Sequence, residues 1–214
     1  MNPMNPMIQK IQEVVIAGDA GSVVAAVQLA LDAGIGPEVL LNDGLILAMG
    51  EVGKQFECGD LFVPEMLLAA RAMQKALDIL RPLLQGAGAK PAGHVVIGTV
   101  KGDLHDIGKN LVSIMLKGAG FELQDLGCDV PAERFVAAVR ESGASVVALS
   151  ALLTTTMLNM RAVIDALAAA GLRDKVKVVV GGAPITDDFA RQIGADGFAA
   201  DASKAVGLVR SLVA

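Results

Sequence analysis

The apolar positions before residue 85 follow the spacing of amphipathic helices. Apolar side chains recur there at intervals of three or four residues in two long runs, and this spacing places each run on one face of a helix. The two runs are Leu45, Met49, Val52 and Phe56, and then Met66, Ala70, Met73, Leu77, Leu80 and Leu84. Two further helices are expected over 8–16 and 23–31, with Asp19 capping the start of the second. The pattern predicts a four-helix bundle over about residues 1–84.

A different pattern begins after residue 93. Short runs rich in β-branched residues alternate with segments of helical spacing, and Pro131 and Pro184 stand where the first turn of a helix tolerates proline. The expected strands are 95–100, 121–126, 146–149, 176–180 and 197–199, and the expected helices are 107–118, 132–142, 156–170, 185–193 and 203–213. This alternation predicts an α/β fold with a flavodoxin-like, doubly wound, five-stranded parallel sheet.

The stretch between the two patterns is rich in glycine, alanine and proline. It reads QGAGAKPAG and has no periodic apolar residues, which is typical of a linker. We therefore expect a helical domain over 1–84, a linker over 85–93 and an α/β domain over 94–214.

The composition excludes several classes of protein. The 214 residues include 18 Lys and Arg against 23 Asp and Glu, for a net charge of −5, and the only aromatic residues are six Phe. A nucleic-acid partner is not expected, because it needs basic patches and stacking platforms. No apolar run is long enough to span a membrane. The N-terminus lacks the pattern of a signal peptide, and Cys58 and Cys128 are too few for a disulfide framework, so a cytoplasmic protein is expected.

Polar residues follow the expected strands at the edge where such a sheet binds its ligands. That edge lies beyond the carboxyl ends of the first and third strands, where the strand order reverses. Asp103 stands two residues before His105, so its carboxylate can accept a proton from one ring nitrogen and leave the other as a lone-pair donor. Gly181 and Gly182 leave space for a bulky ligand. Taken singly, these signals are weak, because a lone loop histidine is usually only a polar loop residue and a glycine pair is usually a tight turn.

In combination the motifs are specific. The α/β half carries VxxDxHDIGKN after its first strand, SALLTTTM after its third and VVVGGAP at its fourth. This order resembles the cobalamin-binding domain of methionine synthase and of the small corrinoid proteins of methyltransferase systems. The helical half carries EVGKQF, FVPEM and AARAM, which resemble the helical cap of that family. The resemblance extends from about residue 40 to the C-terminus.

The resemblance implies a role for individual residues. It makes His105 the lower axial ligand of cobalt and Asp103 its hydrogen-bonded partner, with Thr156 at the position of the serine that completes the relay in the family. Phe56 and Val63 fall where bulky apolar residues of the cap shield a methyl group on cobalt. The remaining residues that it assigns to corrinoid binding, including contacts to the nucleotide tail, are Gly102, Asp106, Gly108, Ser150, Leu152, Thr154, Gly181, Gly182 and Ala202.

The function implied by the resemblance is that of a methyl carrier. A cobalamin or related corrinoid would take a methyl group from a substrate-specific methyltransferase and would then be in its methylcobalamin form. A second methyltransferase would pass it to tetrahydrofolate or coenzyme M, and a reductive activation protein would be a third partner. The chain would not be catalytic alone, and it would act as a freestanding shuttle in one-carbon metabolism. Methanol, methylamines, betaines and aryl methyl ethers all stay open as methyl donors.

Three alternatives share parts of this pattern. A cobalamin-dependent sensor usually adds an output domain or an upper-face ligand, and neither has a counterpart in the sequence. A receiver domain needs an aspartate at the end of the third strand, where Ser150 stands. A mutase subunit shares the Asp-x-His loop but has no helical cap. Because one fold can host all of these functions, the residues of the site must decide among them.

Overall fold

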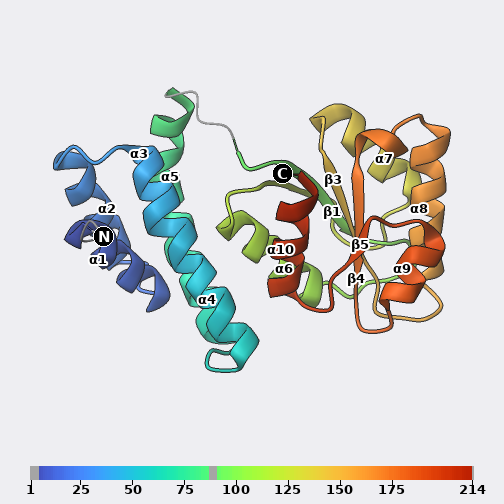
Figure 1. Cartoon of the computed structure of the whole chain (residues 1–214), viewed down its shortest axis with the longest axis horizontal. Coiled ribbons are helices and arrows are strands. Elements are labelled where there is room, and N and C mark those ends of the chain that lie inside the picture. Colours follow the sequence, from blue (N-terminus) through green and yellow to red (C-terminus); the bar gives the residue numbers. More distant parts are fainter. Residues whose placement is uncertain (1–4, 87–90, 214) are drawn as a thin grey trace. The chain divides into compact units, whose positions relative to one another are not determined.

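The structure is a computed structural model, and it describes residues 5–86 and 91–213. The chain divides into two compact units, Met1–Lys90 and Pro91–Ala214 (Figure 1). Among the described residues, no helix is long and apolar enough to cross a membrane.

The first unit consists of helices. Its elements are α1 (Pro6–Ile16), α2 (Ser22–Asp32), α3 (Pro37–Val39), the π-helix η1 (Leu40–Ile46), α4 (Leu47–Cys58) and α5 (Val63–Gly86). Elements α3, η1 and α4 follow one another without interruption, and α1 packs against α2, α4 and α5. Four helical segments of the described chain thus form the bundle. Helix α5 includes Gln85 and Gly86, so the first two residues of the expected linker are helical, and 87–90 lie outside the described residues.

The two predicted apolar faces form much of the core of this unit. Leu45, Met49 and Val52 are buried, whereas Phe56 near the end of α4 is only half-buried. On α5 the buried line is shifted from the predicted one, because Ala69, Ala72 and Ala76 are buried while Ala70 and Leu77 are half-buried. Small alanine side chains allow the neighbouring helices to come close, and this shifts the centre of the face. Asp19 accepts hydrogen bonds from the amides of Gly21 and Ser22 at the start of α2, as a cap does.

The second unit is a parallel sheet covered by helices. Its strands are β1 (His94–Thr99), β2 (Glu122–Asp125), β3 (Val146–Ser150), β4 (Lys177–Gly181) and β5 (Gly197–Phe198). Its helices are α6 (Ile107–Gly118), α7 (Ala132–Ser142), α8 (Leu158–Ala169), the 3-10 helix η2 (Arg173–Lys175), α9 (Asp187–Ile193) and α10 (Ala202–Val213). All strand pairs are parallel and the order is β2-β1-β3-β4-β5. This confirms the predicted fold class and its flavodoxin-like strand order.

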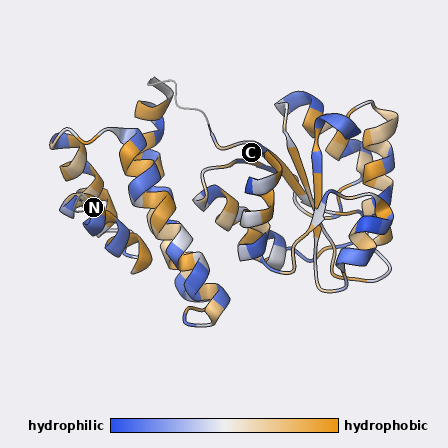
Figure 2. Cartoon of the chain, viewed as in Figure 1, coloured by the Kyte–Doolittle hydropathy of each residue, from blue (hydrophilic) through white to orange (hydrophobic). Residues whose placement is uncertain are grey.

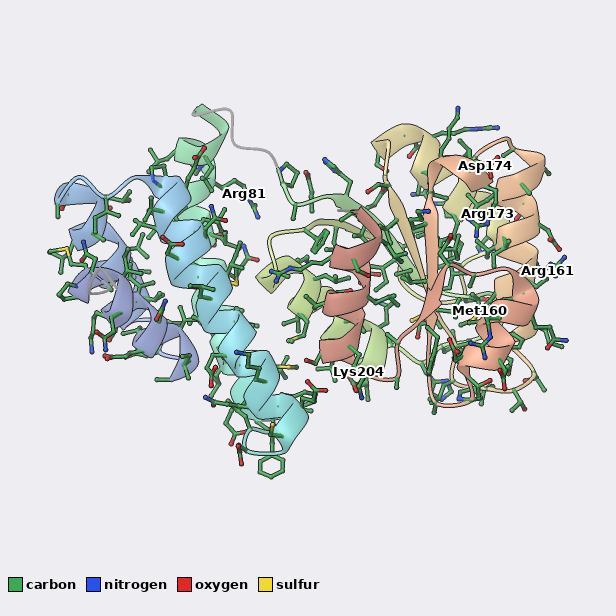
Figure 3. All side chains as sticks on the ribbon, in the orientation of Figure 1. Arg81, Met160, Arg161, Arg173, Asp174 and Lys204 are labelled. Carbon is green, nitrogen blue, oxygen red and sulfur yellow. The ribbon has the colours of Figure 1, made fainter. Side chains whose placement is uncertain are left out.

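Alternate strand residues bury opposite faces of the sheet. Val95 and Ile97 of β1 pack in the core under α6 and α10, and Val96 packs in the core under α7, α8 and α9 (Figure 1). Figure 2 shows mostly hydrophobic residues on β1 and β3, as expected for strands that are covered on both faces. On α8, Met160 is fully buried in this core, whereas its neighbour Arg161 lies on the outer side and pairs with Asp165 (Figure 3).

Two predicted helices begin later than expected. The segment predicted over 156–170 is helical only from Leu158, and Thr156 lies in the preceding turn, where its hydroxyl bonds outside the helix. The segment predicted over 185–193 begins at Asp187, because the side chain of Thr186 accepts the amide of Phe189 and caps the helix. Thr156 and Thr186 therefore belong to the loops after β3 and β4, which lie at the edge where ligands are expected.

Candidate corrinoid site

The site is built where the loops after β1 and β3 meet. The two strands are neighbours, and Thr99 at the end of β1 is paired with Ser150 at the end of β3. A tight turn then redirects the chain, with the amide of Asp103 donating to the carbonyl of Val100 at 3.1 Å. Gly102 occupies the third position of this turn with a φ of 83°, a left-handed conformation that glycine adopts without strain. The turn brings the Asp103 carboxyl group into the gap between the loops, where it is fully buried.

The two oxygens of Asp103 serve the two loops separately. Oδ1 accepts from the backbone amide of His105 at 3.1 Å and lies 2.7 Å from the Nδ1 atom of its ring. Oδ2 accepts the Thr156 hydroxyl at 2.6 Å and the amides of Leu152 and Leu153 at 2.8 and 3.3 Å. Burial alone raises the pKa of Asp103, but the hydrogen bonds from Thr156, Leu152 and His105 outweigh burial and hold that pKa well below its usual value. Asp103 is therefore a carboxylate at neutral pH.

The charge on Asp103 decides the tautomer of His105. A carboxylate only accepts hydrogen bonds, so Nδ1 of the neutral ring must carry the proton and Nε2 must carry the lone pair. The side chain of His105 is 50% exposed, and no hydrogen bond within the described residues engages Nε2. The backbone of His105 is also held, because the buried Thr99 hydroxyl donates to its carbonyl at 2.9 Å. His105 thus offers a single oriented nitrogen at the open edge of the sheet.

The extra methyl group of Thr156 does not disturb the relay. The hydroxyl stays within 2.6 Å of Asp103, and the methyl group faces Gly102, where even an added Cβ would lie at an ordinary contact distance of 3.5 Å. Threonine can therefore do here what serine does in a chain of hydrogen bonds.

Exposed apolar side chains accompany His105 on both loops. Each of these large apolar residues has more than two fifths of its surface exposed. Their exposed fractions are 75% for Leu104, 75% for Ile107, 43% for Leu152, 43% for Leu153 and 65% for Leu158. An apolar surface of this kind around one polar group is typical of a binding site for a large, partly apolar ligand.

The other predicted residues of the α/β unit lie at the same edge, in different surroundings. Ser150 is half-buried, Thr154 is exposed, and Ala202 is buried at the start of α10. Asp106 caps α6, with its carbonyl accepting the amide of Asn110 at 2.8 Å. Position 108 in the first turn of α6 has open space where a side chain would stand. These residues surround the loops but do not take part in the hydrogen bonds of Asp103.

The space predicted beside the glycine pair is absent at the Cβ positions. A Cβ on Gly182 would lie 1.8 Å from the carbonyl oxygen of Ala151, and one on Gly181 would lie 3.1 Å from that of Ala199. The backbone therefore fills this space, and Gly182, with a φ of 133°, allows the loops after β3 and β4 to approach each other. A contact of these glycines with a corrinoid stays a prediction.

Phe56 and Val63 lie in the other unit, on either side of the turn that joins α4 and α5. Gly59 ends α4 in a left-handed conformation, and Phe56 and Val63 are both half-buried. Their neighbour Phe62 is 66% exposed. The shielding role predicted for Phe56 and Val63 stays a prediction.

The part of the chain that the structure describes offers too few ligands to hold a metal ion without a cofactor. Within 5–86 and 91–213, no three His, Cys, Asp or Glu side chains gather in a way that could bind one. His105 can supply one nitrogen, so the other ligands would have to come from the cofactor. A corrinoid brings its own ring of nitrogens around cobalt, so a single histidine among exposed leucines fits this group.

Comparison with known families decides the assignment. The family described as "B12 binding domain" matches residues 93–207, and a second family of the same description matches residues 7–81. The chain belongs to the B12-binding corrinoid proteins. The resemblance inferred from the motifs is thereby confirmed, and so is the expectation of a cobalamin or related corrinoid as cofactor.

The relatives of this corrinoid protein cover its whole length. The dimethylamine corrinoid protein of Methanosarcina barkeri is 43% identical over 97% of the chain and 98% of the relative. Trimethylamine corrinoid protein 1 of Methanosarcina acetivorans is 42% identical over 97% of each chain. Among solved structures, the methanol:cobalamin methyltransferase complex MtaBC from Methanosarcina barkeri matches with a TM-score of 0.89 at 33% identity, over 99% of this chain and 81% of that one. A cobalamin-binding protein from Desulfitobacterium hafniense matches with a TM-score of 0.79 at 32% identity, over 97% and 98%.

Two contributors to the site are not predicted by the sequence pattern. The Leu153 amide bonds to Asp103, and a backbone donor of this kind has no signature in a sequence. Thr99 falls inside a predicted strand, and the signal for its role is a hydroxyl at the carboxyl end of that strand, the edge where ligands bind.

Proposed function

We propose that the protein carries a methyl group on the cobalt of a corrinoid, between a substrate-specific methyltransferase and a second methyltransferase. The observation that carries the proposal is the single free nitrogen of His105, fixed by the buried carboxylate of Asp103 at an open, apolar edge of the sheet. Support comes from relatives named for methylamine systems and from the methyltransferase complex among the similar structures. When bound, the corrinoid supplies the cobalt on which the methyl group travels.

The residues of the α/β unit would bind and orient the cofactor. His105 would be the lower ligand through Nε2, and the exposed leucines would lie under the apolar parts of the ring. Ser150, Thr154 and the backbone near Gly181 would contact the nucleotide tail. Because Nδ1 is engaged by Asp103, only Nε2 can serve as ligand.

The hydrogen bonds that link Thr156, Asp103 and His105 would also hold a proton on Nδ1 of His105. Thr156 donates to one oxygen of Asp103 and Nδ1–H of His105 donates to the other, so Nδ1 keeps the proton and Nε2 keeps the lone pair. In this way the protein would present the His105 ring to the cofactor in one fixed orientation, because both oxygens of Asp103 are already held by hydrogen bonds.

The helical unit would protect the methyl group from water. Phe56, Val63 and the exposed Phe62 present apolar surface at the α4–α5 turn.

A reductive activation protein would restore the carrier after loss of its active oxidation state, and the methyl donor would be selected by the partner methyltransferase. Free thiols at Cys58 and Cys128 support a cytoplasmic location.

Reconstitution tests the proposal directly. The apoprotein is mixed with hydroxocobalamin and dialysed, and the wild type should keep a single corrinoid per chain. After reduction to Co(II), paramagnetic resonance with 15N-labelled histidine should show nitrogen coupling, and His105→Ala should lose that coupling while retaining corrinoid. His94→Ala is the matched control and should behave as the wild type, because His94 is at the opposite end of β1. A dialysed wild type without corrinoid absorbance would refute the proposal, and coupling that persists in His105→Ala would show that another residue is the ligand.

A further inference from the structure

The loop that carries His105 is tied to the connection between β2 and α7. The amide of Gly102 donates to Oδ1 of Asp129 at 2.7 Å. The backbone amide of Asp129 donates in turn to the carbonyl of Asp103 at 2.9 Å. Asp129 therefore holds both Gly102 and Asp103, the two consecutive residues that place the Asp103 carboxylate, although it follows Gly102 by 27 positions in the chain.

Asp129 adopts an uncommon backbone conformation to make these bonds. Its φ is 53°, and it is the single non-glycine residue with a positive φ in the part of the chain that the structure describes. Aspartate tolerates this left-handed region better than most residues, yet it is still disfavoured there. Strained residues of this kind tend to occur where a function needs a fixed geometry.

The bonds of the next residue extend the same frame. The amide of Val130 donates to the carbonyl of Thr99 at 3.0 Å, and the hydroxyl of Thr99 donates to the carbonyl of His105. The connection thus reaches Gly102, Asp103 and Thr99. Asp129 itself is exposed and contributes nothing to the apolar core.

We infer that Asp129 is a positioning residue, which holds the loop so that Nε2 of His105 stands ready for the metal. This inference rests on the proposed function for its meaning. The two hydrogen bonds that join Asp129 to Gly102 and Asp103, called the clamp below, can nevertheless be tested without a cofactor. Without the Oδ1 acceptor, the turn at Gly102 can open, and Asp103 then loses the fixed place from which it orients His105.

A series of variants separates the acceptor from the backbone strain. Asp129→Gly removes the acceptor but adopts a positive φ freely, whereas Asp129→Asn keeps an acceptor oxygen and also tolerates the left-handed region. Asp174→Gly is the control, because Asp174 is an exposed aspartate that precedes β4 and therefore lies at the opposite edge of the sheet (Figure 3).

The first measurement uses the protein without cofactor. Hydrogen exchange of the Gly102 amide should be about tenfold faster in Asp129→Gly, as expected for the loss of one hydrogen bond to a charged group. Asp129→Asn should stay within about threefold of the wild type, and Asp174→Gly should leave the rate unchanged. An exchange rate in Asp129→Gly equal to that of the wild type would overturn the clamp.

The second measurement uses protein loaded with hydroxocobalamin. The cyanide concentration that displaces His105 from cobalt should fall about five- to tenfold in Asp129→Gly, and Asp129→Asn should restore it. Faster Gly102 exchange with an unchanged cyanide midpoint would overturn the positioning role, because the clamp would then be structural only. If the wild type shows no histidine nitrogen on cobalt, the proposed function fails, while the exchange result still decides the clamp.

Discussion

Replacement of Thr156 by valine tests the central hydrogen bond of the site. Thr156 is 7% exposed, and its hydroxyl lies 2.6 Å from Oδ2 of Asp103. Valine keeps the shape of the side chain but leaves the buried carboxylate without one donor. Hydrogen bonds to charged groups contribute about 1.5–3 kcal/mol, so the free energy of unfolding should fall by about that amount. The amides of Leu152 and Leu153 still bond to Oδ2, which keeps the loss near the lower end of this range.

Two further variants make the comparison specific. Thr156→Ser keeps the hydroxyl and removes one methyl group, so it should lose only about 0.8 kcal/mol. Thr155→Val changes an exposed neighbour, and its effect should stay within about 0.5 kcal/mol. Equal losses for Thr156→Val and Thr155→Val would refute the reasoning.

The assay must suit a chain without Trp or Tyr. Urea unfolding is therefore followed by far-ultraviolet circular dichroism, and hydrogen exchange of the Leu152 amide locates the effect in the α/β unit.

The pH dependence of the free energy of unfolding adds a second check. A lowered folded-state pKa stabilises the protein above the unfolded pKa, and this contribution is lost as the pH falls through the folded pKa. The difference between the wild type and Thr156→Val should thus be constant near neutral pH and shrink only below the ordinary carboxyl value of 3.8. A difference that vanished between pH 7 and 5 would mean that Asp103 does not stay ionised as inferred.

Three more predictions follow from other parts of the molecule. Gly182→Ala should destabilise the α/β unit by more than about 2 kcal/mol, because the new Cβ would overlap the carbonyl of Ala151; urea unfolding measures this, and a neutral effect would show that the two loops can separate freely. Phe56→Ala should speed photolysis of bound methylcobalamin while corrinoid binding is retained, and an unchanged photolysis rate would restrict Phe56 to bundle packing. Lys109→Met should lower the free energy of unfolding by about 1–3 kcal/mol in the same assay, because it breaks the 2.6 Å ion pair between the buried Lys109 and Asp125. A more stable variant would mean that the cost of removing the lysine charge from water exceeds the attraction within the pair.

Local patterns were sufficient to predict the architecture of both units. Short β-branched runs such as the one around Val147, and the end of helical spacing before residue 93, reflect only which side chains are removed from water. They did not reveal the π-helix η1, because a π turn changes hydrogen bonds without a strong change in apolar spacing. They also placed the start of α8 too early, since Thr156 lies in the turn before the helix, where its hydroxyl bonds to Asp103, 53 positions away, and to the carbonyl of Leu153.

For the site, the sequence alone determined the residue types: one histidine, one aspartate two positions before it, and a hydroxyl on the neighbouring loop. The tertiary structure decided their state. Hydrogen bonds from the donors of two loops keep the buried Asp103 ionised, and that charge leaves the lone pair of His105 on Nε2. It also decided that Gly182 serves the approach of two backbones and that Asp129, far along the chain, meets Gly102. These facts depend on distances between loops that are remote in sequence, and such distances are set only when the parallel strands pair and bring their carboxyl ends to one edge.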